Sequence, residues 1–342
     1  MREKFFIFTL LLTTPSLWAS NCRTLSPKLA DYLPAKSIKK CHSIEEGLSF
    51  DQIYALDITQ NGEKKKVAVK VLNPLRHLQN RKTIIRVSQL IGQEKWGPEI
   101  LWHSENELIF VMDFLKGKSM TTLEGNEKKM GKALREIHEL LIKDNLGPIV
   151  QRYSMYDRSK KRLGELVQLK LLSEAQHTAI EKYLEGLKPT LDETHKIIIH
   201  NDLKPSNIFD VNGEFLFLDW AETSVASIYD ELGSLSFYFD LSDFQEKELL
   251  TGYFGPPPRA IDLKYLDIHK NLTALHFGLW TLRMGNKPLD AVVLPTAQEY
   301  AALQKSLLDQ NSKTTSPTTF QKVGAFLLSN FQKMQPGKNL AN

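Results

Sequence analysis

Residues 197–207 read IIIHNDLKPSN, and this stretch decides how the rest of the chain is interpreted. Three branched apolar residues in a row are typical of a short buried strand, and a polar loop follows them directly. The loop has the spacing H-x-D-x-x-x-x-N. Phosphoryl transfer needs a carboxylate beside the attacking hydroxyl and an amide oxygen for a metal ion. We therefore predict that Asp202 is the catalytic base or hydroxyl-orienting group, and that Asn207 is a ligand of Mg²⁺.

A second acidic position lies a short distance along the chain. Asn212-Gly213 is a dipeptide typical of tight hairpin turns, and the strand after it leads into Leu218-Asp219-Trp220. Magnesium prefers a few protein oxygens combined with phosphate oxygens. An acid at the end of this strand, close behind Asn207, suits that role, and we predict Asp219 as the second metal ligand.

A lysine earlier in the chain completes the predicted site. Val67-Ala68-Val69-Lys70 is a strongly strand-like run. A lysine at such a position, combined with the downstream loop, predicts contact with the α and β phosphates of ATP. The alternative is a strand lysine whose charged end reaches water.

The pattern of the chain changes near its first third. Up to residue 114 it indicates strands, with a hairpin turn at Asn61-Gly62 and one helix over residues 81–93. Beyond that point helices dominate. The expected elements there are helices over 128–142 and 163–188, interrupted at Gly147-Pro148 and Pro189, a hairpin over 208–219, and helices after Asp230.

Length and composition set the broad class. The chain has 342 residues, of which 42% are hydrophobic and 25% charged, as in an ordinary globular protein. Its net charge of +4 is too small and too scattered to favour a nucleic-acid partner. The oligomeric state is left open by the sequence.

The N-terminus has the pattern of an export signal. Arg2 and Lys4 precede an apolar run over residues 5–12, and small residues follow at Ala19 and Ser20. We predict a signal peptide over residues 1–20 and an exported protein, periplasmic or secreted, with delivery to a host cell as one route. An uncleaved anchor stays open as the alternative, although the apolar run is short for a membrane span. No later segment is long and apolar enough for one, so no stable span is expected after cleavage.

Two cysteines, Cys22 and Cys41, follow the signal region. Two nearby cysteines in an exported chain suggest one disulfide. Two free thiols are the alternative.

Over roughly residues 43–310 these motifs resemble the protein-kinase-like fold, and within it the choline/ethanolamine kinase and aminoglycoside phosphotransferase group. The resemblance implies an α+β, two-lobed protein-kinase-like fold, with a small antiparallel-sheet N-lobe and a larger, mainly helical C-lobe. It implies a nucleotide-binding lobe over 21–114 and a catalytic and substrate lobe over 115–342.

Further site residues come from the resemblance alone. The segment with Gly47 and Ser49 is similar to the group's short phosphate loop. Asp113 and Leu115 lie within residues 112–117, which resemble the hinge that receives adenine through backbone groups. Asp230-Glu231-Leu232-Gly233 resembles the segment whose acid braces the catalytic loop, with Asp230 as the brace. Residues 275–280 resemble a late aromatic helix of choline kinases.

Some side chains have both a functional and a structural interpretation. A quaternary ammonium group is attracted to aromatic faces, so Trp220, Tyr238, Tyr253 and Trp280 are candidates for a cage, with core packing as the alternative. We interpret His138 as a structural histidine of the core.

Two departures from the family pattern matter. Residues 81–93 contain no acid, although the group normally places there a glutamate that pairs with the strand lysine. Lys204, two residues after Asp202, is more typical of protein kinases.

Taken together, these features predict an ATP- and Mg²⁺-dependent phosphotransferase that acts on a small-molecule alcohol, with choline or ethanolamine-like acceptors favoured. The alternatives are a secreted protein kinase and a non-catalytic pseudokinase that serves as a binding module.

Overall fold

The computed structural model describes residues 25–34, 37–44, 51–74, 78–104, 106, 108–144, 146, 150–308 and 315–330. Within these residues the chain forms two compact units. The first unit contains the N-terminal sheet, and the second contains α2 and the elements that follow residue 115. The two are described separately.

The first unit is built on one sheet of the described residues, with the strand order β1-β2-β3-β5-β4. Its strands are β1 (Ile38–Ile44), β2 (Gln52–Gln60), β3 (Glu63–Val71), β4 (Ile100–Ser104) and β5 (Ile109–Asp113). The β2–β3 hairpin turns at Asn61 and Gly62, whose φ angles of 54° and 83° match the left-handed turn that this dipeptide favours. The predicted hairpin is therefore confirmed.

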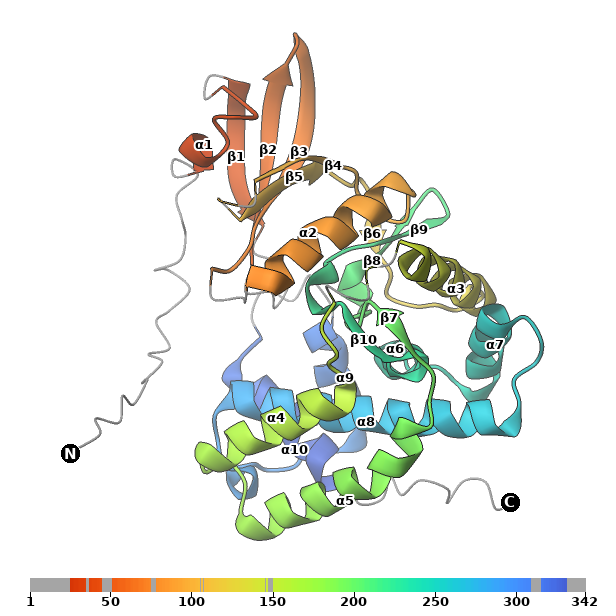
Figure 1. Ribbon diagram of the computed structural model, residues 1–342. Helices are drawn as coiled ribbons and strands as arrows, with labels where there is room; N and C mark the ends of the chain where they lie inside the picture. The colour runs from red at the N-terminus through yellow and green to blue at the C-terminus, as the bar shows by residue number, and fades with distance from the viewer. Residues whose placement is uncertain are drawn as a thin grey trace, which may run out of the picture. The chain divides into compact units, whose positions relative to one another are not determined.

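The short helix α1 (Leu25–Lys28) and the turn after it cover this sheet (Figure 1). Leu25, Leu29 and Leu33 are buried against residues of β2, β3 and β5, which include Tyr54 and Val69. The apolar face of the sheet is thereby removed from water, which is the main force that holds this small unit together.

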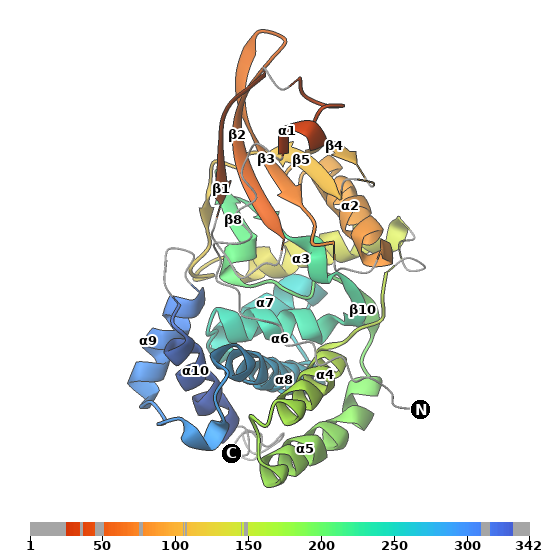
Figure 2. The ribbon, with the colours of Figure 1, turned by 90° about the vertical axis from the view of Figure 1, so that its left-hand side faces the viewer.

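The second unit is mainly helical (Figure 2). Its helices are α2 (Leu78–Gln93), α3 (Glu127–Lys143), α4 (Met155–Gln168), α5 (Glu174–Asp192), α6 (Ile228–Tyr238), α7 (Asp243–Phe254), α8 (Ala260–Gly285), α9 (Ala297–Leu308) and α10 (Pro317–Asn330). Each of α4, α5 and α7 begins with a capping box, in which Ser154, Ser173 or Ser242 accepts from a backbone N–H of the first turn. The long helix α8 packs against α4, α6 and α10.

Close helix packing explains one residue of the predicted acid segment. Gly233 lies on α6 where the backbone of α8 approaches, and a Cβ atom there would lie 2.7 Å from the backbone nitrogen of Lys270. Only glycine allows the two helices to lie this close.

Two small sheets of the second unit hold the loops that carry the predicted site residues Asp202, Asn207 and Asp219. β7 (Lys196–Ile199) pairs antiparallel with β10 (Ser224–Ser227). β8 (Ile208–Val211) pairs with β6 (Lys118–Ser119) and with β9 (Glu214–Phe217). Short 3₁₀ turns, η4 (Pro205–Asn207) and η5 (Trp220–Glu222), precede β8 and β10, and a third, η6 (Leu289–Ala291), follows α8.

Most elements expected from the sequence are confirmed, but some expectations need correction. The helical stretch expected over 163–188 is not continuous, because α4 ends at Gln168 and α5 begins at Glu174, with Ser173 as its cap. The predicted break at Pro189 is wrong, because α5 continues to Asp192. Leu187 and Leu191, buried on either side of the proline, keep the helix packed despite the hydrogen bond that proline cannot make. The strand β10 was not expected, because its four residues include two serines and have little strand propensity of their own. It forms because it pairs with the edge of β7.

Three further observations concern the surface and the termini. Cys41 on β1 is disulfide-bonded, and Cys22, the chain's other cysteine, lies outside the described residues, as does the predicted signal peptide.

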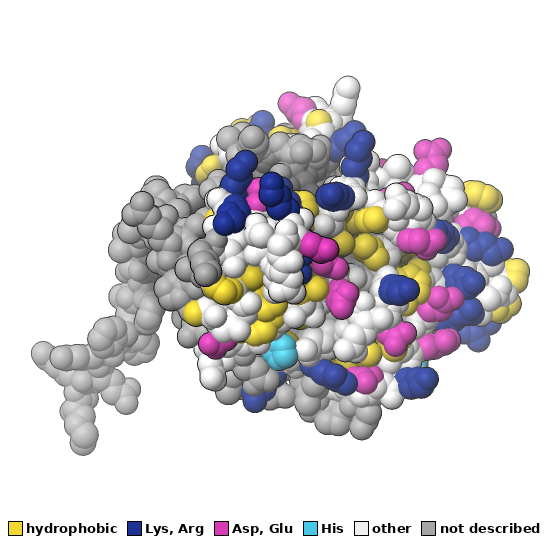
Figure 3. All heavy atoms as spheres, turned by 90° about the horizontal axis from the view of Figure 1, so that it is seen from above, with side chains coloured by type: hydrophobic (Ala, Val, Ile, Leu, Met, Phe, Trp, Pro, Cys, Tyr) yellow, Lys and Arg dark blue, Asp and Glu magenta, His cyan; other side chains and the backbone are white. Residues whose placement is uncertain are grey.

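Among the described helices, none is both long enough and apolar enough to cross a membrane. Basic and acidic side chains are interspersed on the face shown in Figure 3.

Candidate active site

The loop after β7 leaves the strand through a left-handed residue. Asn201 has a φ of 66°, a conformation that asparagine tolerates better than most residues. Its side-chain amide donates to the Tyr153 carbonyl oxygen at 3.2 Å and to the Ser224 hydroxyl at 2.9 Å. These bonds tie the loop to β10 and to the segment before α4, so its direction is fixed.

His200 links the start of the loop to the end of β9. Its Nε2 donates to the Leu218 carbonyl oxygen at 2.8 Å, and its Nδ1 accepts from the Asp202 backbone N–H at 3.3 Å. Its ring lies 4.4 Å from the ring of Trp220, centroid to centroid. The histidine is therefore a positioning residue for Asp202, and Trp220 packs beneath it.

Glu231 on α6 braces the loop from below. One carboxylate oxygen accepts from the Asn201 backbone N–H at 3.0 Å, and the other lies 2.5 Å from His138 Nε2. The Tyr253 hydroxyl donates to His138 Nδ1 at 2.8 Å. Glu231 and His138 are 1% and 2% exposed, so this chain of bonds is shielded from water. His138 is confirmed as a buried core histidine, and it also supports the loop through Glu231.

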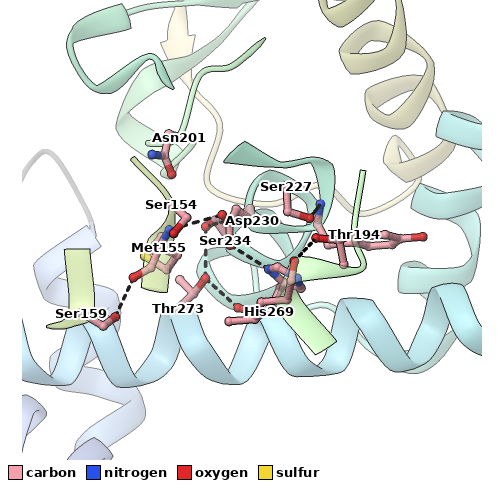
Figure 4. Close-up of polar contacts among 12 residues, drawn as sticks. Ser154, Met155, Ser159, Thr194, Asn201, Ser227, Asp230, Ser234, His269 and Thr273 are labelled. Carbon is pink, nitrogen blue, oxygen red and sulfur yellow. Dashed lines mark hydrogen bonds and ion pairs between the residues drawn. The ribbon is translucent and has the colours of Figure 1, made fainter. Parts of the chain in front are cut away.

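Asp230 does not contact the loop, which corrects the prediction that it is the brace. Its carboxylate accepts from the Met155 backbone N–H at 3.3 Å and lies 2.7 Å from His269 Nδ1 (Figure 4). Consecutive residues of a helix point about 100° apart, so the two neighbouring acids of α6 cannot serve one target. Asp230 instead joins the start of α4 to α8.

Two side chains of the loop contact the Asp202 carboxylate. Lys204 Nζ lies 2.6 Å from Asp202 Oδ2, and Asn207 Nδ2 donates to the same oxygen at 3.0 Å and to the Asp202 carbonyl oxygen at 2.8 Å. Because the Asn207 amide nitrogen faces Asp202, its Oδ1 is directed elsewhere, as a metal ligand would require.

The β8–β9 hairpin brings Asp219 next to this loop. Ile208 is paired with Phe217, and Leu218 N–H donates to the Asn207 carbonyl oxygen at 2.9 Å, so Asp219 follows directly on the residue bonded to Asn207. Asp219 itself is left-handed, with a φ of 62°. Burial acts to lower the pKa of Lys204, but the charges of Asp202 and Asp219 outweigh it and raise that pKa. The structure thus brings Asp202, Asn207 and Asp219 into one region of the second unit.

Lys70 belongs to the first unit. It lies in β3, is 3% exposed, and pairs with Asp51 at 3.3 Å. Asp113 ends β5, Leu115 follows two residues later, and Gly47 and Ser49 lie outside the described residues. The predicted nucleotide contacts of these residues, and the convergence of Lys70 with Asp202 around one triphosphate, stay predictions.

The predicted aromatic cage separates into two groups. Tyr238 and Trp280 both contact Phe277, with ring centroids 5.8 Å and 5.7 Å away. Trp220 packs on His200, and Tyr253 bonds to His138, so these two support the loop. Burial and then the charge of Asp202 raise the pKa of Tyr238 to about 12, so the first group is electrostatically linked to the loop.

Sequence reasoning missed Arg158 on α4. Its guanidinium donates to the Asn201 carbonyl oxygen at 2.8 Å and lies 3.7 Å from Glu222. A cavity of about 300 Å³ lies beside these groups. It is lined by Asn80, Thr83, Ile84, Gln151, Tyr153, Lys161 and residues 220–224. No sequence motif marks Arg158, because an arginine on a polar helix is ordinarily a solvated side chain.

Comparisons with known proteins show the family and the fold of the chain. A model of a phosphotransferase enzyme family matches residues 42–262, more than half of the chain. A protein LicA homolog of Mycoplasma capricolum is 20% identical over 166 residues, and the match covers 48% of this chain. The same match covers 65% of that relative, which is less than two thirds of its length.

Two solved structures illustrate the fold. A choline/ethanolamine kinase family protein from Mesorhizobium loti is 17% identical with a TM-score of 0.60, covering 89% of this chain and 99% of that one. A spectinomycin phosphotransferase in complex with ADP and spectinomycin is 14% identical with a TM-score of 0.55, covering 90% of this chain and 98% of that one. The predicted resemblance and the predicted two-lobed, kinase-like α+β fold are confirmed.

Proposed function

From the premise that the chain belongs to the phosphotransferase enzyme family, we propose that it transfers the γ-phosphate of ATP to a hydroxyl group of a small molecule. The observation that carries this proposal is the contact set of one loop, in which the Asp202 carboxylate lies 2.6 Å from Lys204 and 3.0 Å from Asn207. A carboxylate, a cation and an amide held this way are the parts that phosphoryl transfer needs.

Each residue has a proposed role. Both contacts of Asp202 fall on Oδ2, so Oδ1 can accept the hydrogen bond of the attacking hydroxyl and orient it. Lys204 keeps its positive charge at neutral pH, because Asp202 and Asp219 raise its pKa, and it offsets the charge of the transferred phosphoryl group.

The oxygen atoms present also suit a magnesium ion. Asn207 offers an amide oxygen and Asp219 a carboxylate, which are hard ligands of the kind Mg²⁺ takes in small number beside phosphate oxygens. When bound, Mg²⁺ neutralises phosphate charge. The bond between Leu218 N–H and the Asn207 carbonyl oxygen holds the two ligands in register.

For the acceptor we propose an amino alcohol of the choline or ethanolamine type. The similarity to the choline/ethanolamine kinase family protein of Mesorhizobium loti supports this class. So does the aromatic row of Tyr238, Phe277 and Trp280, since aromatic faces attract quaternary ammonium groups. Glu222 adds a carboxylate on the wall of the cavity beside the loop.

A protein kinase is the second candidate. The specific observation that favours it is Lys204, whose contact with Asp202 at 2.6 Å reproduces an arrangement more typical of protein kinases.

We also propose that the protein is exported, on the evidence of residues 1–20 alone. Sequencing the N-terminus of the protein recovered from the cell envelope and from the medium tests export: a start near residue 20 is expected, and an intact Met1 would contradict it.

The decisive experiment is a turnover assay of the full chain with Mg-ATP and a panel of choline, ethanolamine, aminoglycosides, neutral polyols and protein substrates. We expect labelled phosphate on an amino alcohol, and loss of at least about 10³-fold in kcat for Asp202→Asn, in line with its role in orienting the hydroxyl.

The matched control is Asp192→Asn, an exposed aspartate at the end of α5, which should leave turnover unchanged. Phosphate appearing on protein but not on alcohols would favour the second candidate. Full turnover by Asp202→Asn, or none by the wild type with any acceptor, would overturn the proposal.

A further inference from the structure

The register of the first sheet brings an aspartate to Lys70. Lys70 on β3 lies opposite Ile53 on β2. Side chains alternate between the two faces of a strand, so Asp51, two residues before Ile53, lies on the same face as Lys70. Diagonal neighbours across a strand pair are within reach of long side chains. The contact follows: Lys70 Nζ lies 3.3 Å from Asp51 Oδ2.

This ion pair is buried and held in a fixed geometry. The side chains of Lys70 and Asp51 are 4% and 0% exposed. The other carboxylate oxygen, Oδ1, accepts from the Asn73 backbone N–H at 2.9 Å, just beyond the end of β3. A hydrogen bond thus holds the carboxylate at Oδ1, and the charge of Lys70 lies against Oδ2, which sets the side of Asp51 that faces the lysine.

A buried lysine needs such a partner. An ammonium group removed from water without a counter-charge is strongly destabilised, and it tends to lose its proton. In the kinase-like pattern that the sequence resembles, a helix glutamate fills this role, and α2 contains no acidic residue at all. Among the described residues, Asp51, which directly precedes β2, gives Lys70 a buried carboxylate instead.

We propose that Asp51 is the positioning residue of Lys70, in place of a helix glutamate, and that it holds the ammonium group charged and directed for the phosphates of a nucleotide. The inference rests on the proposed function, since it assigns Lys70 to nucleotide binding. It also removes the main reason to interpret the chain as a pseudokinase, because the missing helix acid has a replacement.

The test is the affinity of the full chain for Mg-ADP, measured by titration calorimetry. Asp51→Asn keeps the size of the side chain and removes its charge, and we expect at least tenfold weaker binding. Asp51→Glu restores a carboxylate and should stay within about threefold of the wild type. The matched control is Asp57→Asn on the same strand, opposite Lys66, with no expected change. If Asp51→Asn is too unstable to purify, Asp51→Ser replaces it with the same expectation.

A second measurement separates positioning from simple stabilisation. Thermal midpoints of Asp51→Asn, Lys70→Met and the double variant form a cycle, and a paired contact predicts that the double variant is no less stable than Asp51→Asn alone. Undiminished ADP affinity in Asp51→Asn would overturn the positioning role and leave the proposed function standing. Coupling in the cycle together with that undiminished affinity would show that the pair is only a stabilising contact. A wild type that binds no ADP would overturn both the positioning role and the proposed function.

Discussion

Asp230 and Glu231 are neighbours on α6, both 1% exposed and both paired with a buried histidine, yet they hold different parts of the molecule. Glu231, with His138, accepts from the backbone of the loop after β7 at Asn201. Asp230, with His269, accepts from Met155 at the start of α4. One helix therefore supports the loop of the candidate site with one acid and the neighbouring helices α4 and α8 with the next.

The difference teaches that the chemistry of a buried acid does not by itself indicate its role. Both acids satisfy a backbone N–H and a histidine, and both would be costly to remove. What separates them is the direction in which each leaves the helix. We therefore expect Glu231 to control the rate of the reaction and Asp230 to control mainly the stability of the fold.

The largest expected effect is that of Glu231→Gln on turnover. The amide cannot accept from both Asn201 and His138, so the loop shifts, and a misplacement of about 1 Å at a catalytic group costs about 10²-fold in rate. We expect kcat to fall about 10²-fold with little change in the KM for ATP. Steady-state kinetics over both substrates measure this. A fall in thermal stability with kcat unchanged would break the comparison, because Glu231 would then act like Asp230.

Asp230→Asn is the matched variant, one residue away. It keeps an oxygen for the Met155 N–H and weakens the bond to His269, and a hydrogen bond to a charged group contributes about 1.5–3 kcal/mol. We expect about 2 kcal/mol less stability, seen as a lower midpoint in urea with an unchanged slope. Turnover of the folded fraction should stay within about fivefold of the wild type. A loss of kcat equal to that of Glu231→Gln would show that the two acids are not separable.

The smallest expected effect sharpens the same comparison. Tyr253→Phe removes only the hydroxyl that donates to His138. His138 itself is linked to the loop through two further contacts, one to Glu231 and one from Glu231 to Asn201. The loss of one buried hydrogen bond is worth about 1 kcal/mol. We expect a comparable loss of stability and a two- to threefold lower kcat, because His138 still contacts Glu231. The measurement is the thermal midpoint together with kcat. No change in kcat would mean that the support of the loop ends at Glu231.

Sequence alone indicated those candidate site residues that lie close together along the chain. Asp202 and Asn207 share one loop, and Asp219 follows on the next hairpin, so local geometry brings them together wherever the rest of the chain lies. The Asn61-Gly62 and Asn212-Gly213 turns were equally predictable, because their left-handed backbone is a property of the dipeptides themselves.

The tertiary structure decided which distant side chains support these residues. Asp51 meets Lys70 only because of the β2–β3 register, and Glu231 rather than Asp230 meets the loop only because of the rotation of α6. Arg158 reaches the loop because α4 packs beside it. Spacing specifies contacts within a turn or a hairpin, whereas contacts between elements depend on register and helix rotation, which the packing of the whole core sets.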